Sequence, residues 1–115
     1  CGFLTAYSVS EAVLKKCTDA VTPQTVFAVV HQKKYSVEQL FVNDAAPSLV
    51  VVCDNIQDPG NLGTIIRSAD AAGADGVVVS QDSVDIFHPK VIRSTMGSIF
   101  HVPVMAANIV DAIGH

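Results

Sequence analysis

The sequence has few basic residues, few cysteines and no long apolar run, and each shortage excludes a class of protein. Seven Lys and Arg stand against eleven Asp and Glu, and this net charge of −4 argues against a protein that coats nucleic acid without specificity. RNA contact through a local basic patch stays open. No apolar run approaches membrane-spanning length, and no signal peptide is recognisable. We therefore expect a cytoplasmic protein that does not contact a membrane.

Metal-binding patterns are also missing from the sequence. The three cysteines (Cys1, Cys17 and Cys53) form no Cys-x-x-Cys pair, and the four histidines are scattered. Because zinc sites need closely spaced ligands, no metal site is predicted. The unpaired cysteines favour a reducing compartment. Cys53 ends an apolar run, so we expect it to pack as a small hydrophobic residue.

Half of the 115 residues are hydrophobic, which is enough for one modest core. After a boundary near Pro47, apolar runs alternate with amphipathic segments, and this alternation predicts an α/β fold: a parallel sheet with flanking helices. The predicted strands are 49–53, 77–80 and 99–104, and the predicted helices are 62–72, 89–96 and 106–113. Earlier in the chain we expect a helix over 8–18 capped by Ser8 or Ser10, a strand over 26–30 and a helical turn over 37–41.

The two central predicted helices each have an apolar face that should pack on the sheet. These faces consist of Leu62, Ile65, Ile66, Ala69 and Ala72 in the first helix, and of Val91, Ile92, Thr95 and Ile99 around the second. Gly73 or Gly76 is expected to end the first helix, because glycine readily adopts the left-handed conformation found at helix ends.

A turn rich in Asp, Pro and Gly opens onto the 62–72 helix and carries the first candidate site. Gly60, Gly63 and Arg67 follow the spacing i, i+3, i+7, so they should line one edge of the helix. The glycines would let a ligand approach Arg67 and the free amides of the first helical turn. Asn61 either caps that turn or offers its amide to a substrate. The alternative is an ordinary tight turn in which Arg67 is a solvated surface charge.

The second candidate surface belongs to the helix predicted after Pro89. Four of its residues recur at i, i+3, i+4 and i+7 and form a basic, small face opposite the apolar one: Lys90, Arg93, Ser94 and Gly97. Such a face can contact a phosphodiester backbone. The alternative is an ordinary solvated helix surface.

Other polar residues near these segments are expected to have structural roles. Paired carboxylates can bind a metal or act as acid and base, but turns also favour Asp for its local hydrogen bonds. We expect turn and capping roles for Asp54, Asp58, Asp82 and Asp85. His88 is expected to begin a helix, and His101 to be structural within a strand.

Together the two candidate segments resemble the SpoU (TrmH-like) family of RNA ribose 2′-O-methyltransferases, in the knotted SPOUT superfamily. Residues 58–67, Asp-Pro-Gly-Asn-Leu-Gly-Thr-Ile-Ile-Arg, look like the first motif of that family. Residues 89–97, Pro-Lys-Val-Ile-Arg-Ser-Thr-Met-Gly, look like its next motif, and Phe-His-Val-Pro follows at 100–103. Residues 1–30 resemble the end of the small RNA-binding domain that precedes the catalytic domain in many members.

The resemblance implies a domain organisation. Residues 48–115 would form the N-terminal part of a SPOUT methyltransferase domain, residues 1–32 the end of a small α/β RNA-binding domain, and residues 33–47 a linker. The later family motifs, which form the knot, most of the S-adenosylmethionine pocket and much of the dimer interface, are absent from this sequence. We therefore expect an incomplete polypeptide that is inactive alone and belongs to a homodimeric protein.

The resemblance also implies a reaction: methyl transfer from S-adenosylmethionine to a ribose 2′-hydroxyl of RNA, either rRNA or tRNA. Arg67 and Asn61 are the implied catalytic residues. Arg67 would stabilise negative charge on the oxygen, because a guanidinium rarely gives up its proton, and Asn61 would position the ribose or phosphate. The implied substrate-binding residues are Gly60, Gly63, Lys90, Arg93, Thr95 and Gly97. The alternative function is a non-catalytic RNA- or nucleotide-binding module.

Overall fold

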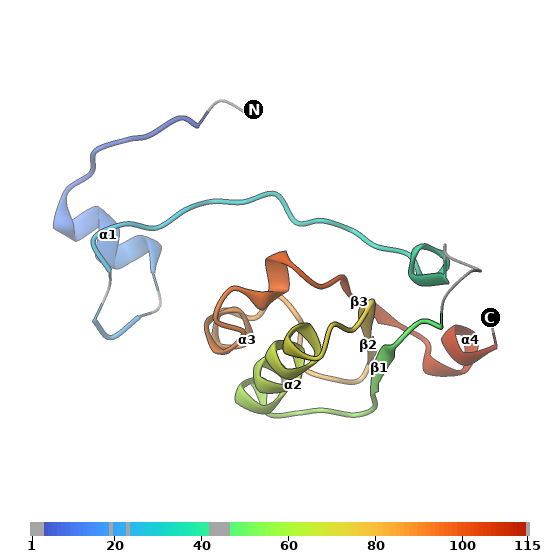
Figure 1. Ribbon diagram of the computed structural model, residues 1–115. Helices are drawn as coiled ribbons and strands as arrows, with labels where there is room; N and C mark the ends of the chain where they lie inside the picture. The colour runs from blue at the N-terminus through green and yellow to red at the C-terminus, as the bar shows by residue number, and fades with distance from the viewer. Residues whose placement is uncertain (1–3, 19, 23, 42–46, 115) are drawn as a thin grey trace. The chain divides into compact units, whose positions relative to one another are not determined.

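The computed structural model describes residues 4–18, 20–22, 24–41 and 47–114. The chain divides into two compact units, Cys1–Gln32 and Lys33–His115 (Figure 1). No helix among the described residues is long and apolar enough to cross a membrane. The roles predicted for 1–32, 33–47 and 48–115 as separate domains stay predictions.

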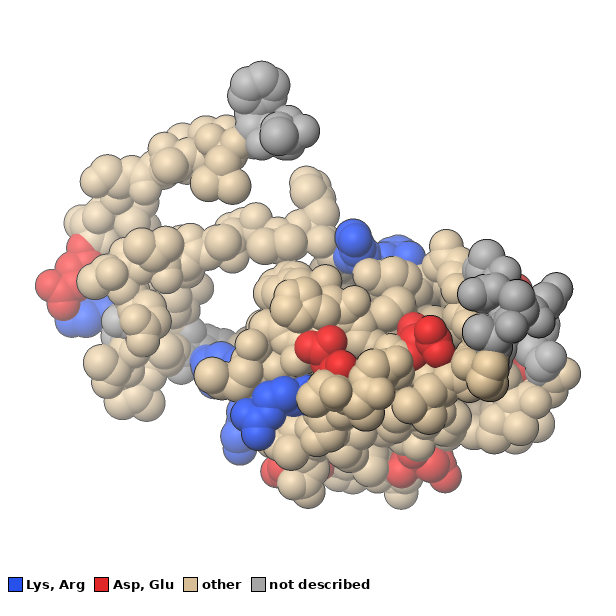
Figure 2. All heavy atoms as spheres, viewed as in Figure 1, with Lys and Arg blue, Asp and Glu red and all other residues tan. Residues whose placement is uncertain are grey.

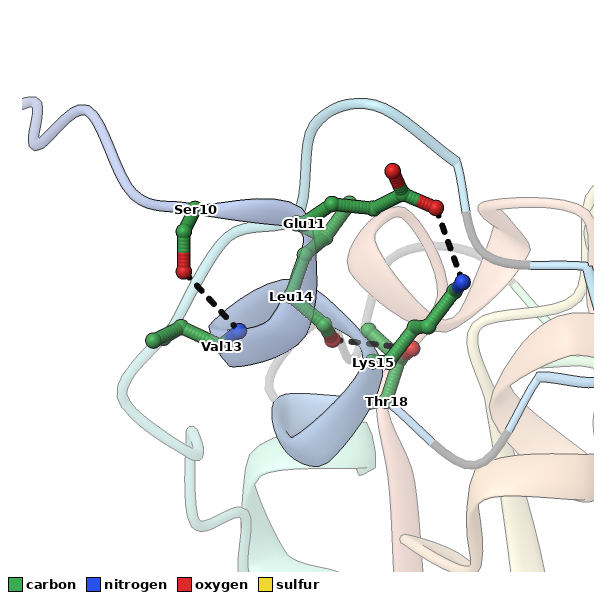
Figure 3. A network of polar contacts seen from close by, with 6 residues as sticks. All are labelled: Ser10, Glu11, Val13, Leu14, Lys15 and Thr18. Carbon is green, nitrogen blue, oxygen red and sulfur yellow. Dashed lines mark hydrogen bonds and ion pairs between the residues drawn. The ribbon is translucent and has the colours of Figure 1, made fainter.

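Helix α1 (Glu11–Cys17) lies in the first unit, and Figure 3 shows the polar contacts around it. The hydroxyl of Ser10 caps it by accepting a hydrogen bond from the Val13 N–H at 3.4 Å. Lys15 pairs with Glu11 at 2.8 Å, one turn apart. The helix predicted over 8–18 is thus confirmed in a shorter form, with Ser10 rather than Ser8 as its cap.

The strand predicted over 26–30 is wrong. These residues run as irregular chain, and the side chains of Val26 and Val29 are 78% and 92% exposed. A strand needs a neighbouring strand to receive its backbone hydrogen bonds. The described residues of the first unit offer no such neighbour, so the β-branched composition alone does not make a strand.

The second unit is built on a three-stranded parallel sheet, which confirms the predicted α/β architecture. Its strands are β1 (Val50–Cys53), β2 (Gly76–Ser80) and β3 (Val104–Ala107), in the order β1-β2-β3. Val77 of β2 lies opposite Val51 on one side and Val104 on the other. Every residue of β2 is buried, which explains its continuous apolar run in the sequence.

Helices cover both faces of this sheet (Figure 1). On one face α2 (Pro59–Ala71) and α3 (Pro89–Ser94) lie side by side, and their Leu62, Ile66 and Val91 are fully buried with the sheet residues. On the other face, Leu40 of the 3₁₀ turn η1 (Val37–Phe41) and Ala112 of α4 (Ile109–Ile113) pack with Val78 and Met105. The helical turn predicted over 37–41 is therefore confirmed as a 3₁₀ turn.

Leu40 shows that part of the 33–47 segment belongs to the core of the second unit. Its side chain is 5% exposed and lies on Gly76. A Cβ at Gly76 would come within 2.5 Å of Leu40 Cδ2, so glycine is needed there to admit the leucine. Gly76 therefore acts in β2, while the left-handed residue after α2 is Gly73, with φ of 72°.

The predicted boundaries shift where the chain turns. The residues expected to form the start of the third strand include a 3₁₀ turn, η2 (Ser98–Phe100), and β3 begins only at Val104. The helical path of α3 ends at its C-cap Thr95. Met96 and Gly97 are both left-handed, with φ of 52° and 96°, and the chain makes one more turn before it extends. His101 consequently lies in that turn and not in a strand. Helix α4 begins at Ile109 rather than 106, because β3 continues to Ala107.

Two residues expected on inner helix faces are outside. Ile92 of α3 is 36% exposed, and Ala72, which follows α2, is exposed as its C-cap. Helix α3 ends at Ser94, so too few turns exist for a full apolar stripe to form.

Candidate functional site

Helix α2 begins at Pro59, three residues earlier than predicted, because Asp58 is its cap. The Asp58 carboxylate accepts a hydrogen bond from the Asn61 N–H at 2.7 Å. The capping role considered for Asn61 is therefore wrong. Its side chain is exposed and has no hydrogen-bond partner within the described residues, which leaves the carboxamide available to a ligand.

Gly63 lies at the point where α2 and α3 cross. It is buried, and a Cβ there would come within 1.7 Å of Ser94 Oγ and 2.8 Å of the Val91 carbonyl oxygen. Gly63 was expected to open a path for a ligand, but its surroundings are filled by α3. Packing of the two helices accounts for the glycine.

Ser94 fastens the crossing with its hydroxyl. Its Oγ donates towards the carbonyl oxygens of Gly60 at 3.2 Å and Pro59 at 3.4 Å, both in the first turn of α2. The sequence placed Ser94 on an outward basic face, whereas it is partly buried against α2. Gly60 is only partly buried, and a Cβ there would meet Asp58 Oδ1 at 3.1 Å and no other group closely.

Arg67 is exposed on α2, one turn beyond Gly63, and makes no ion pair with any described residue. The hydroxyls nearby are occupied: Thr64 donates to the Gly60 carbonyl at 3.0 Å, and Ser68 donates to the Thr64 carbonyl at 2.9 Å. The guanidinium charge therefore has no compensating acidic group within the described structure.

The nearest acidic side chain along α2 is already engaged. Asp70 Oδ2 lies 3.4 Å from Nδ1 of His101, which follows η2. A hydrogen bond from Ser98, and then the one from His101, hold the pKa of Asp70 below its usual value. This tie between α2 and the η2 turn was not predicted, because the two segments are far apart in sequence.

Helix α3 carries the other two basic residues between positions 47 and 114. Lys90 and Arg93 are exposed and have no ion pair within the described residues. Figure 2 shows Lys and Arg atoms gathered where α2 and α3 lie. The imidazole of His88 accepts a hydrogen bond from the Lys90 N–H at 3.1 Å and caps the helix, which confirms its predicted helix-start role.

Thr95 and Gly97 differ from each other in accessibility. Thr95 is fully buried, and its hydroxyl donates to the Ile92 carbonyl at 2.7 Å. Gly97 has open space where a side chain would lie, and its left-handed backbone favours glycine. Of these two predicted substrate contacts, the structure leaves Gly97 within reach of a ligand.

The predicted turn and capping roles are confirmed for two of the four loop aspartates. Asp58 caps α2, and Asp85 Oδ1 accepts a hydrogen bond from the Phe87 N–H at 2.9 Å. No group of His, Cys, Asp or Glu that could hold a metal occurs among the described residues. Cys53 is buried at the end of β1, and burial raises the pKa of its thiol.

The loops that follow β1 and β2 are braced against each other by hydroxyls that sequence reasoning missed. Ser80 Oγ accepts a hydrogen bond from the Asn55 N–H at 2.8 Å, and Ser83 Oγ accepts one from the Ile56 N–H at 3.0 Å. Asn55 itself has a left-handed φ of 50°. This bracing fixes the path of the chain from β1 into α2, and so fixes where Asn61 lies.

Comparison with known proteins assigns this arrangement to a family. The model of the SpoU rRNA Methylase family matches residues 48–115. The 23S rRNA (guanosine(2553)-2′-O)-methyltransferase RlmP of Bacillus subtilis is 44% identical over 103 residues, which cover 90% of this chain and 39% of that protein. The mitochondrial rRNA methyltransferase 3 of Homo sapiens is 40% identical over 95 residues, covering 80% of this chain and 22% of that protein.

Solved structures agree with the sequence comparison. The AdoMet-bound rRNA methyltransferase from Sinorhizobium meliloti has a TM-score of 0.79 at 37% identity, over 91% of this chain and 40% of that one. The SpoU methyltransferase AviRb from Streptomyces viridochromogenes, in complex with the cofactor AdoMet, has a TM-score of 0.60 at 35% identity, over 69% of this chain and 32% of that one. The chain belongs to the SpoU rRNA methylase family, and its sheet with flanking helices is part of a SPOUT methyltransferase fold. It spans less than half the length of these relatives.

Proposed function

We propose that the chain is part of a longer RNA ribose 2′-O-methyltransferase that uses S-adenosylmethionine and acts on ribosomal RNA. The relatives support ribosomal rather than transfer RNA, because those compared are named as rRNA methyltransferases. In this proposal residues 48–115 form the N-terminal part of the methyltransferase domain, and residues 1–32 end an RNA-binding domain. The observation that carries it is Arg67, exposed and without an ion pair in the described structure, on the helix that the family model covers.

The residues around Arg67 fit the acceptor end of such a reaction. S-adenosylmethionine, when bound, supplies a methyl group carried on a sulfonium. The ribose 2′-oxygen becomes negative as its proton leaves, and a fixed cation stabilises that charge without rearranging during the reaction. Arg67 is suited to this role because a guanidinium stays protonated. Most of the cofactor pocket would lie in parts of the protein outside this chain.

Asn61 would hold a different part of the same nucleotide. It precedes Arg67 by six residues on α2, which is about 9 Å along a helix axis. Its free carboxamide can both donate and accept, so it can bind a phosphate oxygen or a sugar hydroxyl while Arg67 faces the reacting oxygen. Two contacts on one rigid helix would align the ribose for in-line attack.

The remaining predicted residues would divide between RNA contact and support. Lys90 and Arg93 would contact the phosphate backbone from the exposed face of α3. Gly63 and Thr95, both buried, would keep α2 and α3 packed, so that Arg67 stays in place. Gly97 would border the RNA surface.

We further propose that the whole protein is a homodimer and acts in the cytoplasm. The family resemblance supports the dimer. The absence of cysteine pairing in the sequence supports a reducing compartment, and the buried thiol of Cys53 is consistent with it.

Methyl transfer by the whole protein tests the proposed function. The assay follows labelled methyl from S-adenosylmethionine into rRNA, and Arg67→Ala should lower kcat by about 100- to 1,000-fold, as loss of one charge-stabilising donor does. Cofactor affinity, measured by calorimetry, should stay unchanged. Arg93→Ala is the matched control: it removes another exposed arginine and should raise KM for RNA rather than lower kcat.

Two results would contradict this assignment. Normal turnover by Arg67→Ala would remove Arg67 from the reaction. RNA binding by the wild-type protein with no methyl transfer to any rRNA would support the alternative, a non-catalytic RNA-binding module.

A further inference from the structure

Three large apolar side chains are exposed in α3 and in the turn that follows it, the segment that also carries Lys90 and Arg93. They are Ile92, Met96 and Phe100, with exposed fractions of 36%, 75% and 61%. Large apolar side chains on a surface usually mark a binding site when they are grouped. These three residues play no part in the core of the second unit.

The turn that carries Phe100 is anchored by its buried neighbours and by backbone hydrogen bonds. Ser98 and Val102, on either side of Phe100, are 7% and 3% exposed, and the Val102 N–H donates to the Ser98 carbonyl at 3.1 Å. The His101 contact with Asp70 ties the same turn to α2. Phe100 is therefore an exposed aromatic residue on a hydrogen-bonded turn, so its backbone loses little freedom when the ring contacts a ligand.

Met96 is held in a costly conformation. Its φ of 52° is left-handed, which disfavours any residue with a side chain, and its N–H donates to the Arg93 carbonyl at 3.3 Å. Met96 directly follows the C-cap Thr95, and a left-handed residue at this position is a common way for a helix to end. The thioether of Met96 is soft and polarisable and packs well against aromatic rings.

The charge of this segment indicates which kind of partner it can bind. From Ile86 to Val110 the sequence has no Asp or Glu, although the whole chain is acidic. Lys90 and Arg93 in this stretch are exposed and have no ion pair within the described residues. Unpaired cations and an exposed aromatic ring in one short segment fit a single-stranded nucleic acid, whose phosphates can bind the cations and whose bases can stack on the ring.

We propose that Met96 and Phe100 form a platform on which an unpaired base of the RNA substrate stacks, while Lys90 and Arg93 contact the neighbouring phosphates. The proposal rests on the proposed function for its ligand. His101, the residue after Phe100, contacts Asp70 at 3.4 Å, and Asp70 lies one helical turn beyond Arg67. The stacked base therefore belongs to a nucleotide close to the one that is methylated, and the platform helps to select an unpaired target.

Binding of a fluorescently labelled single-stranded rRNA segment to the whole protein tests the platform. Phe100→Ala should weaken binding about 5- to 150-fold, the loss expected for one stacked base. Phe100→Trp should retain the affinity, because it keeps an aromatic face. Ile113→Ala is the matched control, since Ile113 is 69% exposed but lies in α4, and it should leave RNA affinity unchanged.

The salt dependence separates stacking from charge. Phe100→Ala should leave the slope of log affinity against log salt unchanged, because stacking releases no counterions, whereas Lys90→Ala should reduce it. A 2-aminopurine base in the RNA should lose fluorescence on binding wild type and not on binding Phe100→Ala.

Three outcomes decide between the platform and its alternatives. Unchanged RNA affinity in Phe100→Ala overturns the platform while methyl transfer by the wild type still supports the proposed function. A changed oligomeric state in Phe100→Ala, measured by sedimentation, also overturns it, because Phe100 would then contact another copy of the protein. Weaker RNA binding by Phe100→Ala with no methyl transfer by the wild type keeps the platform and refutes the enzyme.

Discussion

Replacing Gly63 by alanine tests the packing that holds the candidate catalytic helix. The added Cβ would lie 1.7 Å from Ser94 Oγ and 2.8 Å from the Val91 carbonyl oxygen, whereas ordinary contacts begin at 3.4 Å. Ser94 can rotate its hydroxyl away, but its Cβ would also lie at 2.8 Å, and the Val91 carbonyl belongs to the backbone of α3. The two helices must therefore separate by at least roughly 0.6 Å at the crossing.

The expected cost follows from three contributions. Overpacking of a filled site costs about 1–3 kcal/mol. Loss of the Ser94 hydrogen bonds to the first turn of α2 costs about 1 kcal/mol more. Alanine regains about 1 kcal/mol of helix propensity over glycine. We expect Gly63→Ala to lower the free energy of unfolding by about 2 kcal/mol, measured by urea denaturation of the protein.

Two further variants make this prediction specific to the crossing. Gly60→Ala lies in the same helix but would meet only Asp58 Oδ1, at 3.1 Å, so its effect should stay within about 1 kcal/mol. Combining Gly63→Ala with Ser94→Gly removes the Ser94 side-chain clash and should recover part of the loss, because the two sites are in contact. If Gly63→Ala is as stable as wild type, or if Gly60→Ala is the more damaging, the crossing does not require the glycine.

Two other predictions concern the aspartates at the ends of α2. Asp58→Ala should lower the free energy of unfolding by about 0.5–2 kcal/mol through loss of the helix cap; Asp82→Ala, whose side chain makes no hydrogen bond within the described residues, is the control, and equal effects would count against the cap. Asp70 has a lowered pKa when folded, so its contribution to stability is present above its ordinary pKa of about 4 and is lost as the pH falls through the folded value. Asp70→Asn should therefore be less stable than wild type at pH 7, and the gap in urea midpoint should close towards pH 3. A gap that does not change with pH would show that the bonds from Ser98 and His101 do not favour the carboxylate.

Local sequence patterns were sufficient to predict two of the three strands of the sheet. The apolar runs at 49–53 and 77–80 became β1 and β2. The central strand β2 is buried at every position, as a strand covered on both faces requires, whereas the edge strand β1 leaves Val52 44% exposed. The same reasoning failed at 26–30, where the composition is equally β-branched but the described residues provide no neighbouring strand. Strand formation depends on a partner that composition cannot supply.

Helix starts were harder to predict than helix existence. Asp58 and Asn61 are both good capping residues, and three positions separate them. Asp58 is the N-cap in the structure, because Pro59 suits the first helical position and the Asn61 N–H then reaches the Asp58 carboxylate. That choice has a functional consequence, since it frees the side chain of Asn61.

The sequence by itself determined the α/β class, the parallel sheet and the motifs shared with the SpoU family, because these follow from residue type and spacing along the chain. The tertiary structure alone decided what the small and polar residues do. Gly63 and Thr95 read as parts of an open site but are buried by α3 packing, whereas Arg67 stands exposed and without an ion pair in the described structure. Burial and charge pairing depend on segments that are distant along the chain, so no local pattern can contain them.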